Sequence, residues 1–137
     1  MSRGASEPQW VSRAAIEAAH LDQVRTHGGQ PGLRDEGLLE SALARPQNRW
    51  RYAPDSDLAE LAAACGFGLM KNHPFLDGNK RIGFIAANMF LLLNGYEIDA
   101  PEPQVVDIAL RVADGSLGEE EFAAWIRSVV VPFPEHD

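Results

Sequence analysis

The side chains with the clearest chemical potential lie between His73 and Arg81. This stretch combines a histidine, a carboxylate, an amide and two cations around Pro74 and Gly78. Because Pro74 disfavours helical geometry at the preceding residue, His73 is expected on a loop. A loop histidine can accept a proton near neutral pH, and clustered cations bind anions. The composition and spacing therefore predict a site that handles phosphate.

The residues that follow this loop are expected to open a helix. Asp77 or Gly78 can act as its N-cap, which places Asn79, Lys80 and Arg81 in the first turn. Backbone N–H groups there have no intrahelical partner and bind anions together with the helix dipole. The same dipole disfavours basic side chains in a first turn, so Lys80 and Arg81 indicate a ligand. An anionic ligand is predicted at the helix start.

The stretch from His73 to Arg81 resembles the signature of the Fic fold superfamily. Its Asn79-Lys80-Arg81 triplet is similar to the death-on-curing (Doc) branch, the toxins of toxin–antitoxin pairs. The resemblance extends over most of the chain, from about His20 to Ala124. Upstream blocks that resemble Doc-like chains are Gly28-Gly29, Gly32 to Asp35, Leu38 to Leu43 and Arg45 to Asn48.

The resemblance implies a transferase that uses ATP and Mg²⁺. His73 would be the general base that takes a proton from an acceptor hydroxyl. Asp77 would hold Mg²⁺, a hard cation that prefers carboxylate and phosphate oxygens. Phe75 would pack inward and fix the loop. The catalytic residues implied are His73, Asp77, Asn79, Lys80 and Arg81.

The same resemblance implies how the nucleotide is bound. Gly78 would let the backbone approach the phosphates, and Asn79 would orient the loop or the nucleotide. Lys80 would act as a point charge, whereas Arg81 would bind phosphate through a bidentate fork. Phosphoryl transfer needs mainly positioning and charge neutralisation, which these residues would supply.

Two reactions fit such a site. Most Fic proteins carry Gly in the place of Lys80 and typically transfer AMP; a Lys there is associated in Doc-like proteins with phosphoryl transfer. By resemblance, the acceptor would be a threonine hydroxyl of elongation factor Tu, and its modification would block translation. Pro74 and Gly78 are closer to general Fic usage than to some Doc chains, which keeps AMP transfer as the alternative.

Two further alternatives belong to other functional classes. Arg13 and His20 share one expected helix at a spacing similar to a ribonuclease motif of helical toxins, although they lie near opposite edges of that helix. A non-catalytic binding module is the second. The complete set of polar residues between His73 and Arg81 argues against a decayed site.

Regulation is expected from a separate protein. Fic proteins that inhibit themselves carry Ser or Thr, three residues, Glu, then Gly or Asn. The nearest match, Ser56 to Glu60, is followed by Leu61. An antitoxin is therefore expected in trans, laying a disordered segment into a groove near the site, where it folds.

Composition bounds the class of protein. With 137 residues and 45% hydrophobic content, the chain suits one domain spanning 1–137, with flexible ends at 1–8 and 132–137. The single Cys65 cannot form an internal bridge, which fits a reducing cytoplasm. A net charge of −8 argues against direct nucleic-acid binding. The longest apolar stretch, Ile82 to Leu93, is too short and interrupted to span a membrane.

The hydrophobic periodicity predicts an all-α bundle of about six helices. The run 79–94 is apolar nearly all round, which predicts a central buried helix with the active-site loop at its N-terminus. Pro46 is expected to stop the second helix, leaving 45–57 as the longest connection. The other predicted helices begin near Val11, Leu38, Leu58, Gln104 and Glu120, the last with a capping box from Ser116. Tyr96 to Ile98 is expected to be a short extended piece.

Overall fold

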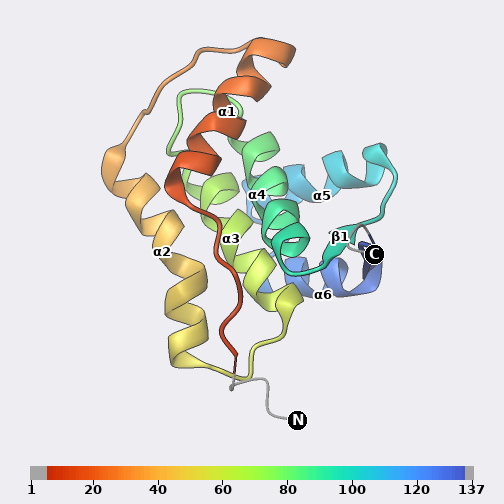
Figure 1. The fold of residues 1–137 in the computed structure, drawn as a ribbon. Coiled ribbons are helices and arrows are strands. Elements are labelled where there is room, and N and C mark those ends of the chain that lie inside the picture. The colour runs from red at the N-terminus through yellow and green to blue at the C-terminus, as the bar shows by residue number, and fades with distance from the viewer. Residues whose placement is uncertain (1–5, 135–137) are drawn as a thin grey trace.

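The computed structural model describes residues 6–134, which form six helices and a two-stranded antiparallel ribbon (Figure 1). The predicted helical bundle is confirmed, and the ribbon is a small addition to it. No helix within residues 6–134 is long and apolar enough to cross a membrane. In chain order the elements are α1 (Arg13–His27), α2 (Glu36–Tyr52), α3 (Leu58–Asn72), α4 (Asn79–Leu93), β1 (Tyr96–Ile98), α5 (Glu102–Asp114), α6 (Glu119–Val129) and β2 (Val130–Pro132).

Helix α3 occupies the middle of the bundle and packs against α2, α4, α5 and α6 (Figure 1). Ten of its fifteen residues are buried, compared with seven of the fifteen in α4. The central position therefore belongs to α3 more than to the predicted 79–94 helix. Small side chains are the reason, because a Cβ on Gly66 would lie only 2.4 Å from the carbonyl oxygen of Gly83 in α4. Cys65 is buried in α3, as predicted, and burial raises the pKa of its thiol.

Helix α4 has one buried face and one open face. Ile82, Ala86 and Phe90 are fully buried against the core. Lys80 and Phe84 lie on the open face, which borders a groove. The long apolar run in the sequence thus supplies both a core contact and the wall of a site.

Helix α2 continues through Pro46, so the predicted stop at this residue is wrong. A proline inside a helix removes one backbone hydrogen bond at a cost of about 3 kcal/mol. Leu39, Ala42 and Pro46 are all buried and recur at helical spacing, so burial of this face offsets that loss. Packing of α2 against the rest of the bundle thus outweighs the local preference of proline to end a helix.

The connection between α2 and α3 is consequently shorter than predicted, because only 53–57 are non-helical. The connection between α1 and α2, 28–35, is longer. Trp50 is half-buried and packs edge-on against Trp10 with ring centroids 6.3 Å apart. Tyr52, by contrast, is 93% exposed and so available to a partner.

The ribbon ties down the C-terminal part of the described chain. The predicted extended piece at Tyr96–Ile98 is confirmed and pairs with β2, so that Tyr96 faces Pro132. The N–H of Phe133 donates to the carbonyl oxygen of Gly95 at 2.9 Å. Residues 132 and 133, where the sequence predicts a flexible end, take part in these contacts, and their flexibility stays a prediction. The expected flexibility of 1–5 and 135–137 lies outside the described residues.

Two predicted helix starts have different outcomes. The capping box of α3 is confirmed, because Asp57 and Glu60 each accept a backbone hydrogen bond from the other residue at 2.8 Å. The start of α6 is Gly118 rather than Ser116, with the Glu121 carboxylate accepting the Gly118 N–H at 2.8 Å. Gly118 adopts the extended geometry of an N-cap. Because glycine has no side chain, only the half of the capping box that Glu121 provides is present.

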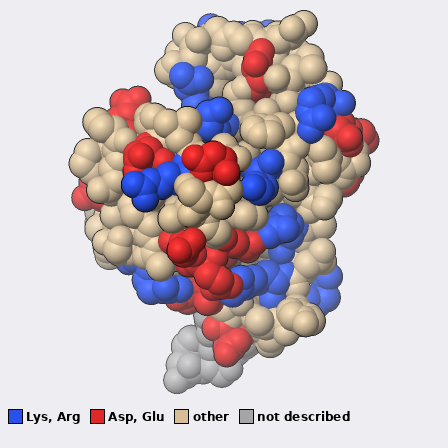
Figure 2. All heavy atoms as spheres, turned by 180° about the vertical axis from the view of Figure 1, so that it is seen from behind, with Lys and Arg blue, Asp and Glu red and all other residues tan. Residues whose placement is uncertain are grey.

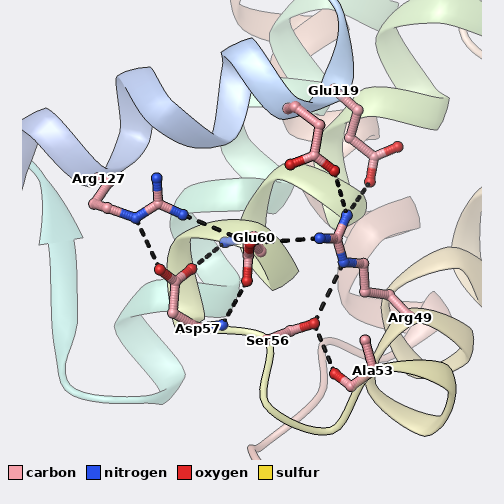
Figure 3. A network of polar contacts seen from close by, with 8 residues as sticks. Arg49, Ala53, Ser56, Asp57, Glu60, Glu119 and Arg127 are labelled. Carbon is pink, nitrogen blue, oxygen red and sulfur yellow. Dashed lines mark hydrogen bonds and ion pairs between the residues drawn. The ribbon is translucent and has the colours of Figure 1, made fainter.

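A polar network joins α2, α3 and α6 on one side of the bundle (Figure 3). Arg49 pairs with Glu60 at 3.5 Å and with Glu120 at 3.1 Å, and Arg127 pairs with Asp57 at 2.8 Å.

Figure 2 shows basic and acidic side chains interspersed on one face rather than separated into broad patches of one sign. Basic side chains therefore lie next to acidic ones on this face, although the chain has a net negative charge.

Candidate active site

The end of α3 places His73 on a loop, as predicted. Helix α3 ends at Asn72, and His73 is its C-cap in the left-handed conformation, with φ of 52°. A positive φ is uncommon for a residue with a side chain, so it needs support from its surroundings. Arg34 gives that support: its Nε donates to the His73 carbonyl oxygen at 2.6 Å, and its Nη2 donates to that of Asn72 at 2.7 Å.

The surroundings of His73 favour its neutral form. Partial burial lowers the pKa of His73 below its usual 6.5, and the positive charges of Lys80, Arg34 and Lys71 lower it further. The side chain is only half-buried and so remains accessible. A neutral, accessible imidazole at pH 7 can accept a proton.

Asn79 fixes the loop from the first turn of α4. Its side-chain oxygen accepts the N–H of Phe75 at 3.0 Å, and its amide nitrogen donates to the Phe75 carbonyl oxygen at 3.0 Å. Asn79 is 7% exposed and Phe75 is 3% exposed, so both contacts are shielded from water. The inward position expected for Phe75 is confirmed, and the geometry of Asn79 suits a loop-orienting residue.

His20 supports the same loop from α1. Its ring is buried and stacks on Phe75, with ring centroids 3.8 Å apart. Its Nε2 lies 2.7 Å from the carbonyl oxygen of Asp77. Arg13 is engaged elsewhere, in ion pairs with Glu17, Glu36 and Glu40. The structure thus gives no support to a ribonuclease pair. Only the helical register of His20 on the face of Ile16 and Val24 could have indicated its burial.

Asp77 is exposed at the turn before α4. One carboxylate oxygen, Oδ2, accepts the N–H of Gln30 at 2.8 Å, which fixes the side chain. Among the described residues there is no group of three or more His, Cys, Asp or Glu that could hold a metal. A single anchored carboxylate suits Mg²⁺, which commonly takes one or two protein carboxylates and completes its shell with water and phosphate.

The start of α4 combines an uncapped first turn with basic side chains. Gly78 is the N-cap at φ of 76°, and a Cβ there would lie 3.5 Å from His20 and from Val24. The cap has no side-chain hydrogen bond, and the first turn contains no acid. Lys80 and Arg81 are both exposed. The free backbone N–H groups of this turn therefore lie next to two cations, without a competing carboxylate from the turn.

A groove of about 610 Å³ opens beside this helix start. The polar end comprises Gly78 to Arg81 with His27 from the last turn of α1. Neither His27 nor its neighbour in the groove, Gln23, was among the predicted site residues, because nothing in their local sequence marks them. His73 and Asp77 are outside the groove lining. The other end of the groove is mostly apolar, with Asn88 and Glu102 as its polar members, and is lined by Ile85, Ile98, Val105, Val106, Ala109 and Leu110.

The chain is thus a helical bundle with a loop histidine ahead of a cationic helix start. The model of the Fic/DOC family matches residues 10–91, and the chain belongs to this family. It is 31% identical over 118 residues to the protein kinase doc of Escherichia phage P1, covering 85% of this chain and 92% of that protein. It is 39% identical over 95 residues to toxin Doc of Mycolicibacterium smegmatis, covering 64% of this chain and 72% of that toxin.

These relatives confirm the resemblance to Doc toxins that the loop indicates. The chain is a homologue of Doc toxins, one of which carries the name of a protein kinase.

Proposed function

We propose that this chain is a toxin that moves the γ-phosphoryl group of ATP to a hydroxyl group of a translation factor in the cytoplasm. Elongation factor Tu is the expected target. The observation that carries the proposal is the environment of His73, an accessible imidazole with a lowered pKa next to the cationic start of α4. A proton acceptor and an anion site side by side are what transfer from a nucleotide to a hydroxyl requires.

In this reaction, His73 would take the proton of the acceptor hydroxyl as its oxygen bonds to the γ-phosphorus. The bond between that phosphorus and ADP breaks at the same time. Lys80, Arg81 and the free N–H groups after Gly78 would bind the phosphate oxygens and offset their growing charge. Asn79 would act through the loop, because both its side-chain contacts are to Phe75.

Asp77 is the residue that would hold Mg²⁺. When bound, the ion would neutralise charge on the phosphates. The hydrogen bond from Gln30 to Oδ2 orients the carboxylate and leaves Oδ1 for this contact.

Transfer of AMP is the second candidate reaction. It is less favoured because Lys80, which takes the place of the Gly typical of AMP-transferring relatives, lines the groove beside Gly78. A long cation there occupies the space where inner phosphates would lie. Phosphoryl transfer therefore remains the leading proposal.

Incubation with elongation factor Tu, Mg²⁺ and ATP tests the reaction, with intact mass as the readout. We expect one added phosphate. Two ATP analogues identify the bond that breaks: a β,γ-imido analogue should stop phosphoryl transfer, whereas an α,β-methylene analogue should still support it. The Asp77→Asn variant keeps an acceptor for Gln30 but loses the charge, so it should lose most activity; Asp107→Asn on α5 is the matched control.

Three results would contradict the proposal. An adenylyl adduct, with the opposite response to the two analogues, would assign AMP transfer. Full activity of Asp77→Asn would remove this residue as the metal ligand. Stable binding to elongation factor Tu with no adduct would favour a non-catalytic binding module.

We further propose that an antitoxin restrains the chain in trans. Glu60, the nearest counterpart of a self-inhibitory glutamate, is held in the α3 capping box and pairs with Arg49 at 3.5 Å. The Glu60 carboxylate is therefore engaged in structural contacts. The apolar end of the groove exposes Val106 and Leu110, each 49% exposed and one turn apart on α5. A partner helix with apolar anchors fits such a surface.

Co-expression tests this partner. A small protein encoded beside the toxin should restore growth of cells that express the wild-type chain. It should fail to restore growth with Val106→Glu/Leu110→Glu, provided that this variant is still toxic. Failure to rescue the wild type would count against restraint by that neighbour.

A further inference from the structure

Residues 28–35, hereafter the latch, run along the active-site loop and bind it at several points. The Arg34 and Asp35 N–H groups donate to the Pro74 carbonyl oxygen at 2.7 and 3.0 Å. The Leu76 N–H donates to the Gly32 carbonyl oxygen at 3.0 Å. Leu33 and Phe75 form an isolated antiparallel bridge. The latch thus makes an antiparallel backbone contact with the active-site loop.

Arg34 adds a side-chain contact that differs from these. Its guanidinium donates to two successive carbonyl oxygens, those of Asn72 and His73, at the point where α3 ends. The last carbonyls of a helix lack intrahelical partners, and a cation there is favoured by the dipole. A planar fork can satisfy both carbonyls at once, which a lysine ammonium does with less geometric control. The contact therefore fixes the left-handed backbone of His73.

The charge of Arg34 acts on the same histidine. Three cations face His73 from the three elements around it: Lys80 from α4, Arg34 from the latch and Lys71 from α3. All three favour the neutral imidazole, after the larger effect of partial burial. Arg34 is the member of this set that also contacts the His73 backbone.

We propose that Arg34 is a positioning residue that holds His73 in the orientation and charge state needed to accept the substrate proton. The proposal rests on the proposed role of His73 as the base. Arg34 would have two separable roles. Its guanidinium hydrogen bonds fix the His73 backbone, and its positive charge favours the neutral imidazole. Removing the fork should lower kcat more than it changes KM for ATP, because Lys80 and Arg81 stay in place.

Two substitutions separate the hydrogen bonds of Arg34 from its positive charge. Arg34→Met removes both and should lower kcat by roughly a hundredfold, the size expected when a reacting group is misplaced by about 1 Å. The acidic limb of its pH–rate profile should move to higher pH, because loss of the nearby cation raises the pKa of His73. Arg34→Lys keeps the charge, so it should lower kcat by less and leave the limb in place. Arg111→Ala, an exposed arginine on α5, is the control.

A titration of the His73 Cε1–H signal by NMR provides a readout independent of activity. The signal is assigned by its absence in His73→Ala. The pKa should rise in Arg34→Met and stay near wild type in Arg34→Lys. If the wild-type chain modifies no target, the proposed function fails while this titration still tests Arg34. An unchanged pKa in Arg34→Met, wild-type kcat in that variant, or wild-type kcat in Arg34→Lys would each overturn the proposal.

Discussion

The His73→Ala variant is expected to lose roughly 10²–10⁴-fold in kcat for phosphoryl transfer, the usual contribution of a general base. The fold should survive, because the loop is held mainly by backbone contacts and by Asn79, not by the imidazole. ATP affinity should change little, since the groups proposed to bind phosphate lie on α4. Single-turnover rates and ATP binding, measured on the same preparations, check both statements.

The wild-type rate should also depend on pH in a defined direction. A general base works when neutral, so activity falls as pH drops through the pKa of His73. Burial and nearby cations hold that pKa below 6.5, which places the acidic limb of the kcat/KM profile below pH 6.5. Added imidazole should partly restore His73→Ala. Near-normal rates in this variant, or an acidic limb above pH 7, would show that His73 is not the base.

Replacing Gly66 by alanine is the structural change with the largest expected effect. The new Cβ would lie 2.4 Å from the carbonyl oxygen and 3.2 Å from the carbonyl carbon of Gly83. Backbone atoms cannot turn aside, so α3 and α4 must separate. Overpacking of this kind costs about 3 kcal/mol, and the helix preference of alanine returns about 1 kcal/mol. We expect a net loss of about 2 kcal/mol and a fall in Tm of roughly 6–10 °C.

Gly37→Ala is the matched control, because the Cβ there meets only the Asp35 carboxylate oxygen at 3.4 Å. This exposed position in the first turn of α2 should tolerate alanine without loss of stability. Thermal and urea unfolding of the two variants give the comparison. Equal stability of Gly66→Ala and wild type would mean that the helices are not in such close contact.

The sequence by itself determined the helical class, the ends of several helices and the chemical composition of the site. Gly28 ends α1, the Asp57 and Glu60 pair opens α3, and Pro74 puts His73 on a loop. Each of these depends on residues a few positions apart. Local backbone preferences and capping rules act over that range, which is why the printed sequence suffices for them.

The tertiary structure decided everything that depends on distant partners. Helix α2 passes through Pro46 because α2 packs along α3, and α3 takes the central place because Gly66 and Gly83 let two backbones meet. Arg34 reaches His73 from 39 residues away, and His20 reaches Asp77 from 57 residues away. Such contacts form only when the chain closes on itself, since no periodicity or cap encodes which surface will face which. The motif supplies the proposed reacting groups, and the packed bundle supplies their positions.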